Sequence, residues 1–437
     1  MKPNGVPTPR AGAPHDLRHL ISPDHPVLKE IKMNLSFFTN FANNIAQQEA
    51  QMNVLQQQIS TGLAVQTPDQ NPAAFATAAM GNDQISALAN DNTTQANIQV
   101  QLGSVSNTYT SVSSLLNNVQ SVVEQALNGT TSAQNLNALA SQVNSSSNQL
   151  LALANTTSSN GTFLFGGSRG SVAPFQSNSS GNIVYMGDGG QSQATIAPNI
   201  TAATIANGSV FVSGLKGDGT SQVTANTTNT GTGQVLQEGV VNAAAAHAFQ
   251  AGNSPITLSF AVSGGQTTYT ATQGGATLSS GPVTQNTQGQ SSVQLGGVDY
   301  QISGAPANGD SFTLSPSRPQ SAFDLLKTIA TALSSAASTP AQVAQTNQIL
   351  NQSLAGLAQY QQGVVTAQAQ NGVTLQAITN AGASNTNQST AIQTNVQNAT
   401  AVNMPVAIAN LDQTLTALQA AMKAFGTAQS LSLFTYI

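Results

Sequence analysis

The stretch "MNLSFFTNFANNIAQQEAQMNVLQQQIST", residues 33–61, decides how this chain folds. Large apolar side chains recur in it at alternating intervals of three and four residues, with one polar interruption at Gln48. Such a heptad repeat places them along one face of a helix, as in a coiled coil. The predicted stripe consists of Phe38, Phe41, Ile45, Met52, Leu55 and Ile59.

A similar stripe occupies the other end of the chain, where we predict a helix over about 402–430. It consists of Met404, Ile408, Leu411, Leu415, Leu418, Met422 and Phe425. The chain then ends "AQSLSLFTYI", residues 428–437, which carries Leu431, Leu433, Phe434, Tyr436 and Ile437. A lone amphipathic helix is only marginally stable in water. We therefore expect the two terminal helices to pair with each other and with copies from neighbouring subunits. The predicted assembly interface comprises Phe38, Phe41, Ile45, Met52, Leu55, Ile59, Leu411, Leu415, Leu418, Met422, Phe425, Leu431, Leu433, Phe434, Tyr436 and Ile437.

Between the two terminal helices in the sequence, a second set of apolar stripes predicts a helical core formed within one copy of the chain. Gly62, Pro68 and Pro72 end the first helix. A helical hairpin over 80–156, joined near Gly129, is predicted next. Its stripes, and the one expected to pack on them, are Ile98, Leu102, Val105, Tyr109, Val112, Leu116, Val119 and Val123, then Leu136, Leu139, Val143, Leu150 and Leu153, and finally Val343, Leu350, Leu354, Leu357 and Val364.

Residues 161–319 are rich in Gly, Thr and Ser and contain short runs with a period of two, which is typical of β-strands. In "ITLSFAV" the apolar residues Ile256, Leu258, Phe260 and Val262 share one face. "SVQLGGVDYQIS" shows two alternating runs around a Gly-Gly pair, which predicts a hairpin. We expect a small sandwich or two small β modules here.

The fold class is therefore α+β and multidomain: a long coiled-coil-like bundle from both ends of the chain, with an inserted β-rich domain. The N-terminal helical part spans 33–160, the inserted β domain 161–319 and the C-terminal helical part 320–437. Residues 1–32 hold half of the Lys and Arg of the whole chain and differ in composition from everything after Met33. They are expected to be a disordered leader or to reflect a misassigned start, with translation beginning at Met33.

Composition narrows the function. Only 6% of residues are charged, against about 25% in an average soluble protein. The net charge of −5 provides no basic surface for nucleic acid, and no apolar run is long enough for membrane insertion. The chain contains no cysteine, which excludes disulfides and thiolate metal sites. Such a composition fits an extracellular bacterial surface or appendage protein better than an enzyme.

The residues that catalysis needs are scarce. His247 is expected on a helix surface or in a loop, and Arg169 in a hinge formed by the surrounding glycines. Asp299 and Asp310 lie on or beside neighbouring strands, where solvation at a strand edge or turn is expected rather than a carboxylate pair. We predict no catalytic residue, no cofactor and no metal.

Four motifs resemble the flagellin-like family of flagellar hook-associated protein 3, the hook–filament junction proteins. They are "QQQISTGLAVQTPDQNPAAFATA" (56–78), "GTFLFGGSRGSVAPF" (161–175), "VQLGGVDYQISGAPANGDSFTLSPSRPQSAFDLLKTIATAL" (293–333) and "ALQAAMKAFGTAQSLSLFTYI" (417–437). The chain departs from the family in lacking the basic residue after Ser-Thr-Gly, where Leu63 and Ala64 stand, and in keeping only Asp69 of an acidic pair. The Asp-rich entry to the last helix is replaced by "NATAVNMP". The resemblance therefore implies no salt bridge at these positions.

The resemblance implies a non-enzymatic structural protein of the bacterial flagellum, located outside the cell at the hook–filament junction. It implies export through the flagellar type III system, with a cytosolic chaperone at the C-terminal helix. It also implies a ring of about eleven copies, with hook-associated protein 1 on the hook side and flagellin on the filament side. Flagellin itself is the alternative, and a secreted adhesin that displays the β insert is a second alternative.

Overall fold

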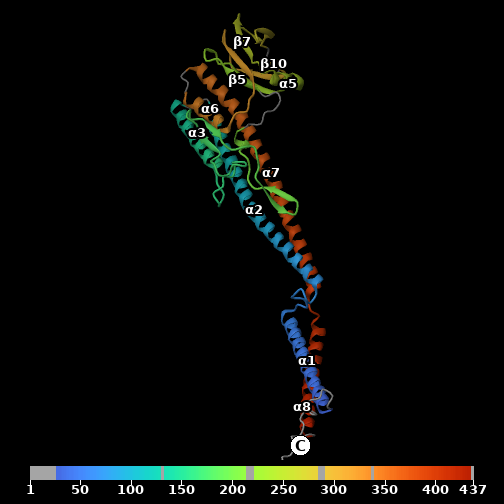
Figure 1. The fold of residues 1–437 in the computed structure, drawn as a ribbon. Coiled ribbons are helices and arrows are strands. Elements are labelled where there is room, and N and C mark those ends of the chain that lie inside the picture. The colour runs from blue at the N-terminus through green and yellow to red at the C-terminus, as the bar shows by residue number, and fades with distance from the viewer. Residues whose placement is uncertain (1–25, 129–131, 213–220, 284–290, 336–338, 435–437) are drawn as a thin grey trace, which may run out of the picture. The chain divides into compact units, whose positions relative to one another are not determined.

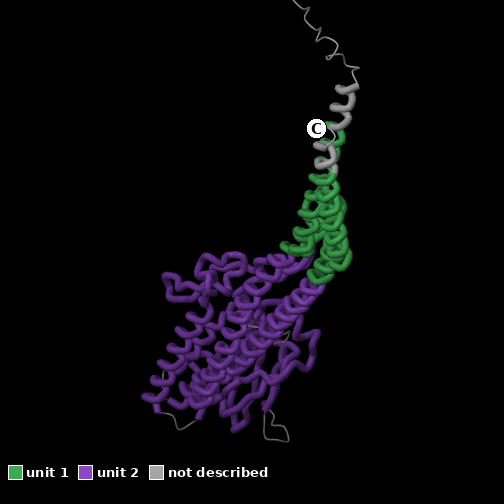
Figure 2. Tube along the Cα trace, turned by 90° about the horizontal axis from the view of Figure 1, so that it is seen from below, with its two compact units in different colours: residues 1–87, 388–437 green, residues 88–387 purple. Residues whose placement is uncertain are grey.

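The computed structural model describes residues 26–128, 132–212, 221–283, 291–335 and 339–434, with side chains from residue 35 to residue 427. Within these ranges the chain consists of long N- and C-terminal helices with a β-rich region between them (Figure 1), which confirms the predicted fold class. It divides into two compact units, residues 1–87 with 388–437 and residues 88–387 (Figure 2). Each unit is described by itself.

The first unit contains α1 (Pro26–Thr61) and α8 (Met404–Phe434), together with the ends of α2 (Pro72–Leu127) and α7 (Pro340–Thr400). Two helices begin earlier than the stripes predict, α1 at residue 26 instead of 33 and α2 at residue 72 instead of 80. Proline suits the first turn of a helix, because its φ is already helical and no partner is needed for its nitrogen. Residues 26–32 of the predicted leader therefore belong to α1, while residues 1–25 lie outside the described residues.

The helical core of the second unit lies between α2, α3 (Ala133–Ala154), α6 (Ala322–Ser334) and α7. The stripe predicted on α2 is buried along its whole length, from Ile98 to Val123. Leu350, Leu357 and Val364 of α7 are buried as well, so the predicted intramolecular core is confirmed for these helices. Val343 was assigned to this stripe wrongly, because it lies in the first turn of α7 and is exposed.

Two small hairpins lie on this helical core. They are β1 (Phe175–Ser177) with β2 (Ile183–Tyr185), and β3 (Gln193–Ala197) with β4 (Ile200–Ala203), followed by the single turn α4 (Ser209–Val212). Phe175 and Phe211 belong to the same buried cluster as the helices. Ile196 packs with Ile98 and Ile378, and its carbonyl accepts a hydrogen bond from the amide of Asn385 at 3.1 Å.

The remaining strands form the β module, Ser221–Pro316, which has its own buried core. One sheet has the strand order β5-β12-β7-β8-β9 and the other β10-β11-β6. The predicted hairpin is confirmed, since β10 and β11 pair across Gly296 and Gly297, which have φ angles of +57° and +80°. The elements are β5 (Ser221–Ala225), β6 (Gln234–Val240), α5 (Ala243–Gly252), β7 (Ile256–Ser263), β8 (Gln266–Gln273), β9 (Ala276–Pro282), β10 (Ser291–Leu295), β11 (Val298–Ser303) and β12 (Ser311–Pro316).

Candidate assembly interface

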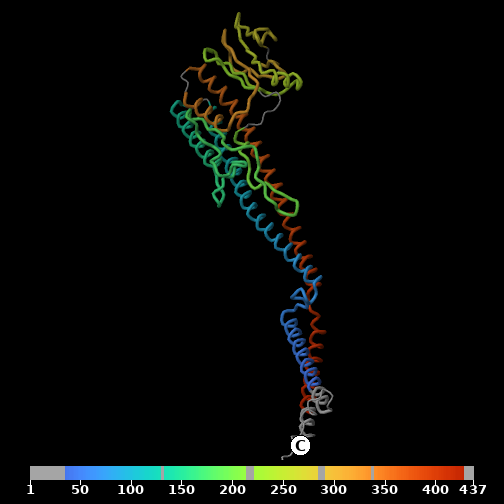
Figure 3. Tube along the Cα trace, viewed as in Figure 1, coloured from blue at the N-terminus to red at the C-terminus, as the bar shows by residue number. Residues whose placement is uncertain are grey.

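The apolar stripe of α1 is half-buried against α8. Its six predicted residues, with Gln48 and Gln58, are the only half-buried side chains of α1 between residues 35 and 61, and none is fully buried. Phe41 and Phe425 stack at 4.9 Å between ring centroids, and Phe38 makes a T-shaped contact with Phe425 at 5.6 Å between centroids. At the other end of the pair, Ala64 N donates to Thr400 O at 2.7 Å. The two helices are therefore antiparallel, and they can be followed side by side in Figure 3.

Only part of the stripe predicted on α8 faces α1. Leu418 is buried, and Leu411, Leu415 and Phe425 are half-buried, while Ala407, which was not predicted, is buried as well. Met404, Ile408 and Met422, by contrast, are 40%, 46% and 48% exposed. The least exposed face of α8 runs through 407, 411, 414, 418, 421 and 425, so Ala407 and Ala421 lie at the contact instead of the neighbouring Ile408 and Met422 that the prediction named. An alanine at the contact lets two helices approach closely, which turns the neighbouring large side chains outward.

Met404, Ile408 and Met422 form what we call the outer apolar stripe. Leu35, Phe37 and Val54 of α1 are also exposed. Of these, Met404, Ile408 and Met422 share one side of α8, which is where we expect another protein to associate with the helix pair. The first unit therefore leaves apolar surface that its own helices do not cover. The side chains of Leu431, Leu433, Phe434, Tyr436 and Ile437 lie outside the described residues.

Amide side chains hold the turn between α1 and α2, where the sequence departs from the family motif. Gln66 N donates to Gln70 Oε1 at 2.6 Å, and Gln57 Nε2 donates to Gln66 Oε1 at 2.8 Å. Asn71 caps α2 by accepting from Ala74 N at 3.1 Å, as its side chain is suited to do. Hydrogen bonds between uncharged groups thus stabilise this turn.

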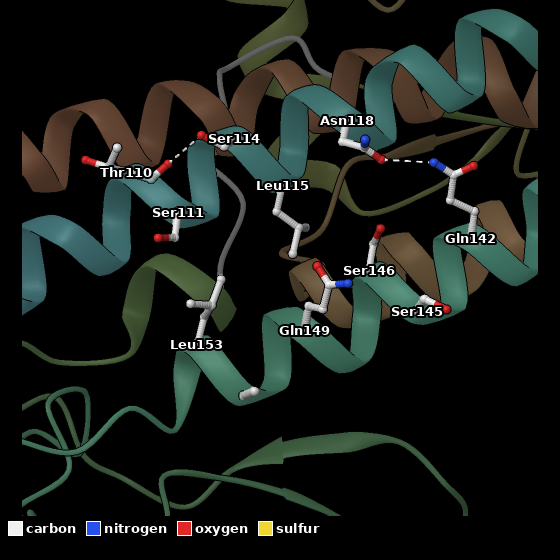
Figure 4. A pocket seen from close by; sticks show the side chains of 11 residues that line it. Thr110, Ser111, Ser114, Leu115, Asn118, Gln142, Ser145, Ser146, Gln149 and Leu153 are labelled. Carbon is white, nitrogen blue, oxygen red and sulfur yellow. Dashed lines mark hydrogen bonds between the residues drawn. The ribbon is translucent and has the colours of Figure 1, made fainter.

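A groove of about 830 Å³ runs between α2 and α3 (Figure 4). Hydroxyl and amide side chains line most of the groove, and Leu115 and Leu153 add apolar surface to it. Across the groove, Gln142 Nε2 donates a hydrogen bond to Asn118 Oδ1 at 3.3 Å. Every residue of its lining is uncharged. This surface offers hydrogen bonds and apolar contact, but no acid or base for catalysis.

Of the two aspartates named from the sequence, Asp310 is bound by backbone amides, whereas Oδ1 of Asp299 is buried without a hydrogen-bond partner among the described residues. Asp310 is 2% exposed, and its carboxylate accepts from Thr230 N and Ala307 N at 2.8 Å each and from Gly231 N at 3.1 Å. The expectation that Asp310 is solvated in a turn is therefore wrong, because three backbone amides replace water. His247 lies on the exposed face of α5, as predicted. Among the described residues no cluster of three metal-binding side chains occurs.

The segment around Arg169 is a turn that hydrogen bonds to the Asp188 carboxylate hold in place. Asp188 accepts from Ser168 N at 2.7 Å and from Gly190 N at 3.1 Å, and also from the Ser168 hydroxyl. These hydrogen bonds, that of the hydroxyl first, hold the pKa of the Asp188 carboxyl below its usual range. A side chain at Gly167, which has a φ of +69°, would meet Asp188 O at 2.3 Å.

In the described part of the chain, no helix is both long and apolar enough to cross a bilayer.

Comparison with known proteins bears on this arrangement. The family model of the bacterial flagellin N-terminal helical region matches residues 34–169. Flagellar hook-associated protein 3 of Escherichia coli (strain K12) is 34% identical over 120 residues, which are 27% of this chain and 38% of that protein. The chain is thus matched to well under two thirds of the length of this curated relative.

Solved structures cover more of the chain. The crystal structure of FlgL from Xanthomonas campestris in space group C2 is 28% identical, covers 72% of this chain and 99% of that one, and has a TM-score of 0.64. Flagellar hook associated protein-3 from Legionella pneumophila shares the fold, with a TM-score of 0.66 at 23% identity over 73% of this chain and 98% of that one. These similar proteins are structural proteins of the flagellum and not enzymes, which agrees with the expectation of a non-enzymatic chain. Together the comparisons confirm the resemblance that the motifs indicated: in sequence and in fold, this chain is similar to flagellar hook-associated protein 3 within the flagellin-like proteins.

Proposed function

We propose that this chain is a structural component of the bacterial flagellum, an adaptor that joins the hook to the filament outside the cell. Its likeness to hook-associated protein 3 of Escherichia coli and to FlgL of Xanthomonas campestris supports this role. In this role the chain is exported through the flagellar type III system, with a cytosolic chaperone on its C-terminal helix. Its neighbours are hook-associated protein 1 on the hook side and flagellin on the filament side.

The observation that carries the assembly part of the proposal is the incomplete burial of α1 and α8. The α1 side of their contact is only half-buried, and the outer apolar stripe of α8 remains exposed. Covering such surface contributes roughly 25 cal/mol per Å² of apolar area. We infer that the terminal helices pack with those of neighbouring copies in a closed ring. The apolar residues from Leu431 to Ile437 are expected to be buried in the same contact.

Deletion of the gene in the bacterium that encodes it tests the role directly. Electron microscopy should then show hooks without filaments, with flagellin released as monomer into the medium. Loss of flagellin from both cells and medium would instead identify this chain as the filament subunit. Normal filaments would contradict the junction role and favour an adhesin, which a glycan-binding screen of the full chain would examine.

A variant that lacks residues 428–437 tests the route of assembly. It should fail to restore filaments in the deletion strain while its β module remains folded, as shown by retained protection of the β-module amides from hydrogen exchange. Restored filaments would show that the apolar chain end is not needed for assembly.

A further inference from the structure

Two strands of the β module stand at sheet edges next to the helical core. β5 is an edge of the five-stranded sheet, and β6 is an edge of the three-stranded sheet. The two edges meet, since Ser221 N donates to Gln237 Oε1 at 2.8 Å. An edge strand presents a row of backbone N–H and C=O groups that lack a neighbouring strand. Other groups must satisfy them wherever they are buried.

The side-chain amides of two glutamines of α7 hydrogen-bond to backbone groups on these strand edges. Gln348 is 1% exposed, and its Oε1 accepts from Val235 N at 2.7 Å while its Nε2 donates to Val235 O at 2.6 Å. Gln352 pairs in the same way with β5 when its amide is assigned from its surroundings, with the nitrogen toward Val223 O and the oxygen toward Val223 N. In that orientation it donates to Val223 O at 2.9 Å and accepts from Val223 N at 2.8 Å. A primary amide carries one acceptor and two donors on a flat group, so it pairs with a backbone residue much as a peptide group does. Each glutamine therefore takes the place of one residue of a missing strand.

The amides form a row on one face of α7. Gln345 Nε2 donates to Asn226 O at 3.2 Å, and Asn351 Nδ2 donates to Gln234 Oε1 at 3.4 Å. Positions 345, 348 and 352 are spaced three and four residues apart and so lie on the same side of a helix. The row thus follows the edges of both sheets from a single helix.

The β module and the helical core have separate apolar clusters, so contacts of another kind must contribute to the attachment of the module to α7. The buried apolar residues of the β module form one cluster, and those of α2, α3, α6 and α7 form another, with no residue in common among those described. The attachment of the module to α7 is therefore not provided by a shared core, and the amide pairs of the buried Gln348 and the half-buried Gln352 contribute to it directly.

We propose that Gln348 and Gln352 act as a surrogate strand that docks the β module on α7 and closes the β5 and β6 edges to strand addition by another copy of the chain. The inference does not depend on the flagellar role. It assigns the two glutamines as positioning residues for the module.

The test is hydrogen exchange on the full-length variants Gln348→Met and Gln352→Met, because methionine has a similar length but cannot pair with the backbone. Gln348→Met should speed exchange of the Val235 amide about tenfold and leave Val223 unchanged, and Gln352→Met should do the reverse. The matched control is Gln362→Met, since Gln362 is an exposed glutamine of the same helix. Unchanged exchange at both valines, or equal acceleration of all β-module amides, would overturn the proposal.

The double variant tests the closing of the edges. Light scattering after size-exclusion chromatography, at protein concentrations below the one at which the control assembles through its terminal helices, should show oligomers that grow with concentration and that the control does not form. If the double variant unfolds, the two single variants still decide the matter, because only a local pairing predicts their opposite patterns. A double variant that stays folded and does not form these oligomers would overturn the edge-closing part.

Discussion

Asp310 lies just before β12, and its buried carboxylate accepts hydrogen bonds from three backbone amides of two loops. Asp310→Asn replaces one acceptor oxygen by an NH₂ group that would face these donors. Because a buried donor left unpaired costs about 1–3 kcal/mol, and more when a charged partner is lost, we expect a loss of about 2–4 kcal/mol in the free energy of unfolding. Urea denaturation of the full chain would measure it.

Asp299 provides the matched control for this change. It lies on β11, and its Oδ1 is buried without a hydrogen-bond partner among the described residues. Asp299→Asn should therefore be neutral or slightly stabilising, because it removes a charge that has little compensation. Equal losses for the two variants would show that the number of amide donors does not set the cost.

Ionisation of the Tyr109 phenol should lower the stability of the helical core at alkaline pH. Burial raises the pKa of its phenol from 10.0 to about 12. Since the folded pKa lies above the unfolded one, the stabilisation is fully present below pH 10 and is lost as the pH rises through 12. The difference of about 2 pH units corresponds to about 2–3 kcal/mol. Denaturation of the wild type at pH 9 and pH 11.5 should show most of this loss, and Tyr109→Phe should lose less; equal losses would contradict the burial effect.

At the scale of elements, α8 carries two apolar stripes with different tasks. Leu418 is 7% exposed and faces α1, whereas Met422 belongs to the outer apolar stripe. Leu418→Ala should lower the stability of the helix pair by about 2–5 kcal/mol, because it opens a cavity. Met422→Ala should change that stability by less than about 0.5 kcal/mol but weaken filament restoration in the deletion strain. Thermal melting followed at 222 nm and filament counts separate the two; full restoration by Met422→Ala would contradict the role of the outer stripe.

Two glycines of α2 differ in what surrounds them. A Cβ at Gly81 would meet Val396 Cγ2 at 2.4 Å and Ile392 Cγ2 at 3.2 Å, whereas nothing lies within 4 Å of a Cβ at Gly103. Gly81→Ala should therefore destabilise the first unit by about 1–3 kcal/mol through overpacking. Gly103→Ala should stabilise the second unit by up to about 1 kcal/mol, because alanine favours the helix. Stabilisation by both changes would show that α7 yields at Val396 without cost.

These elements also show what a sequence can reveal. The α2 stripe from Ile98 to Val123 was predictable, because each position holds a large apolar residue and all of them are buried. The contact face of α8 was not, because Ala407 takes a core position while the larger Ile408 beside it is exposed. The pairing of Gln348 with Val235 leaves no periodic signal at all, since a glutamine on a helix pattern reads as a surface residue.

At the scale of the whole molecule, the scarcity of charge should govern how assembly responds to solution conditions. Between residues 35 and 61 of α1 the only charged residue is Glu49, and between residues 404 and 427 of α8 they are Asp412 and Lys423. Both stripes are uncharged, so little Coulomb energy is available for salt to screen, even though the Debye length is about 10 Å at 0.1 M. Burial of apolar surface must then provide most of the driving force, and that force weakens on cooling and strengthens in sulfate.

We therefore expect the concentration at which the purified chain begins to assemble to change less than about twofold between 0.05 and 0.5 M NaCl. Sodium sulfate should lower this concentration, and cooling should raise it. Sedimentation of the full chain over a range of protein concentrations measures the threshold under each condition, with Met422→Ala as the variant whose threshold is raised throughout. A steep dependence on NaCl would contradict apolar association, and would direct attention to the basic residues among 1–32 as the groups that join the copies.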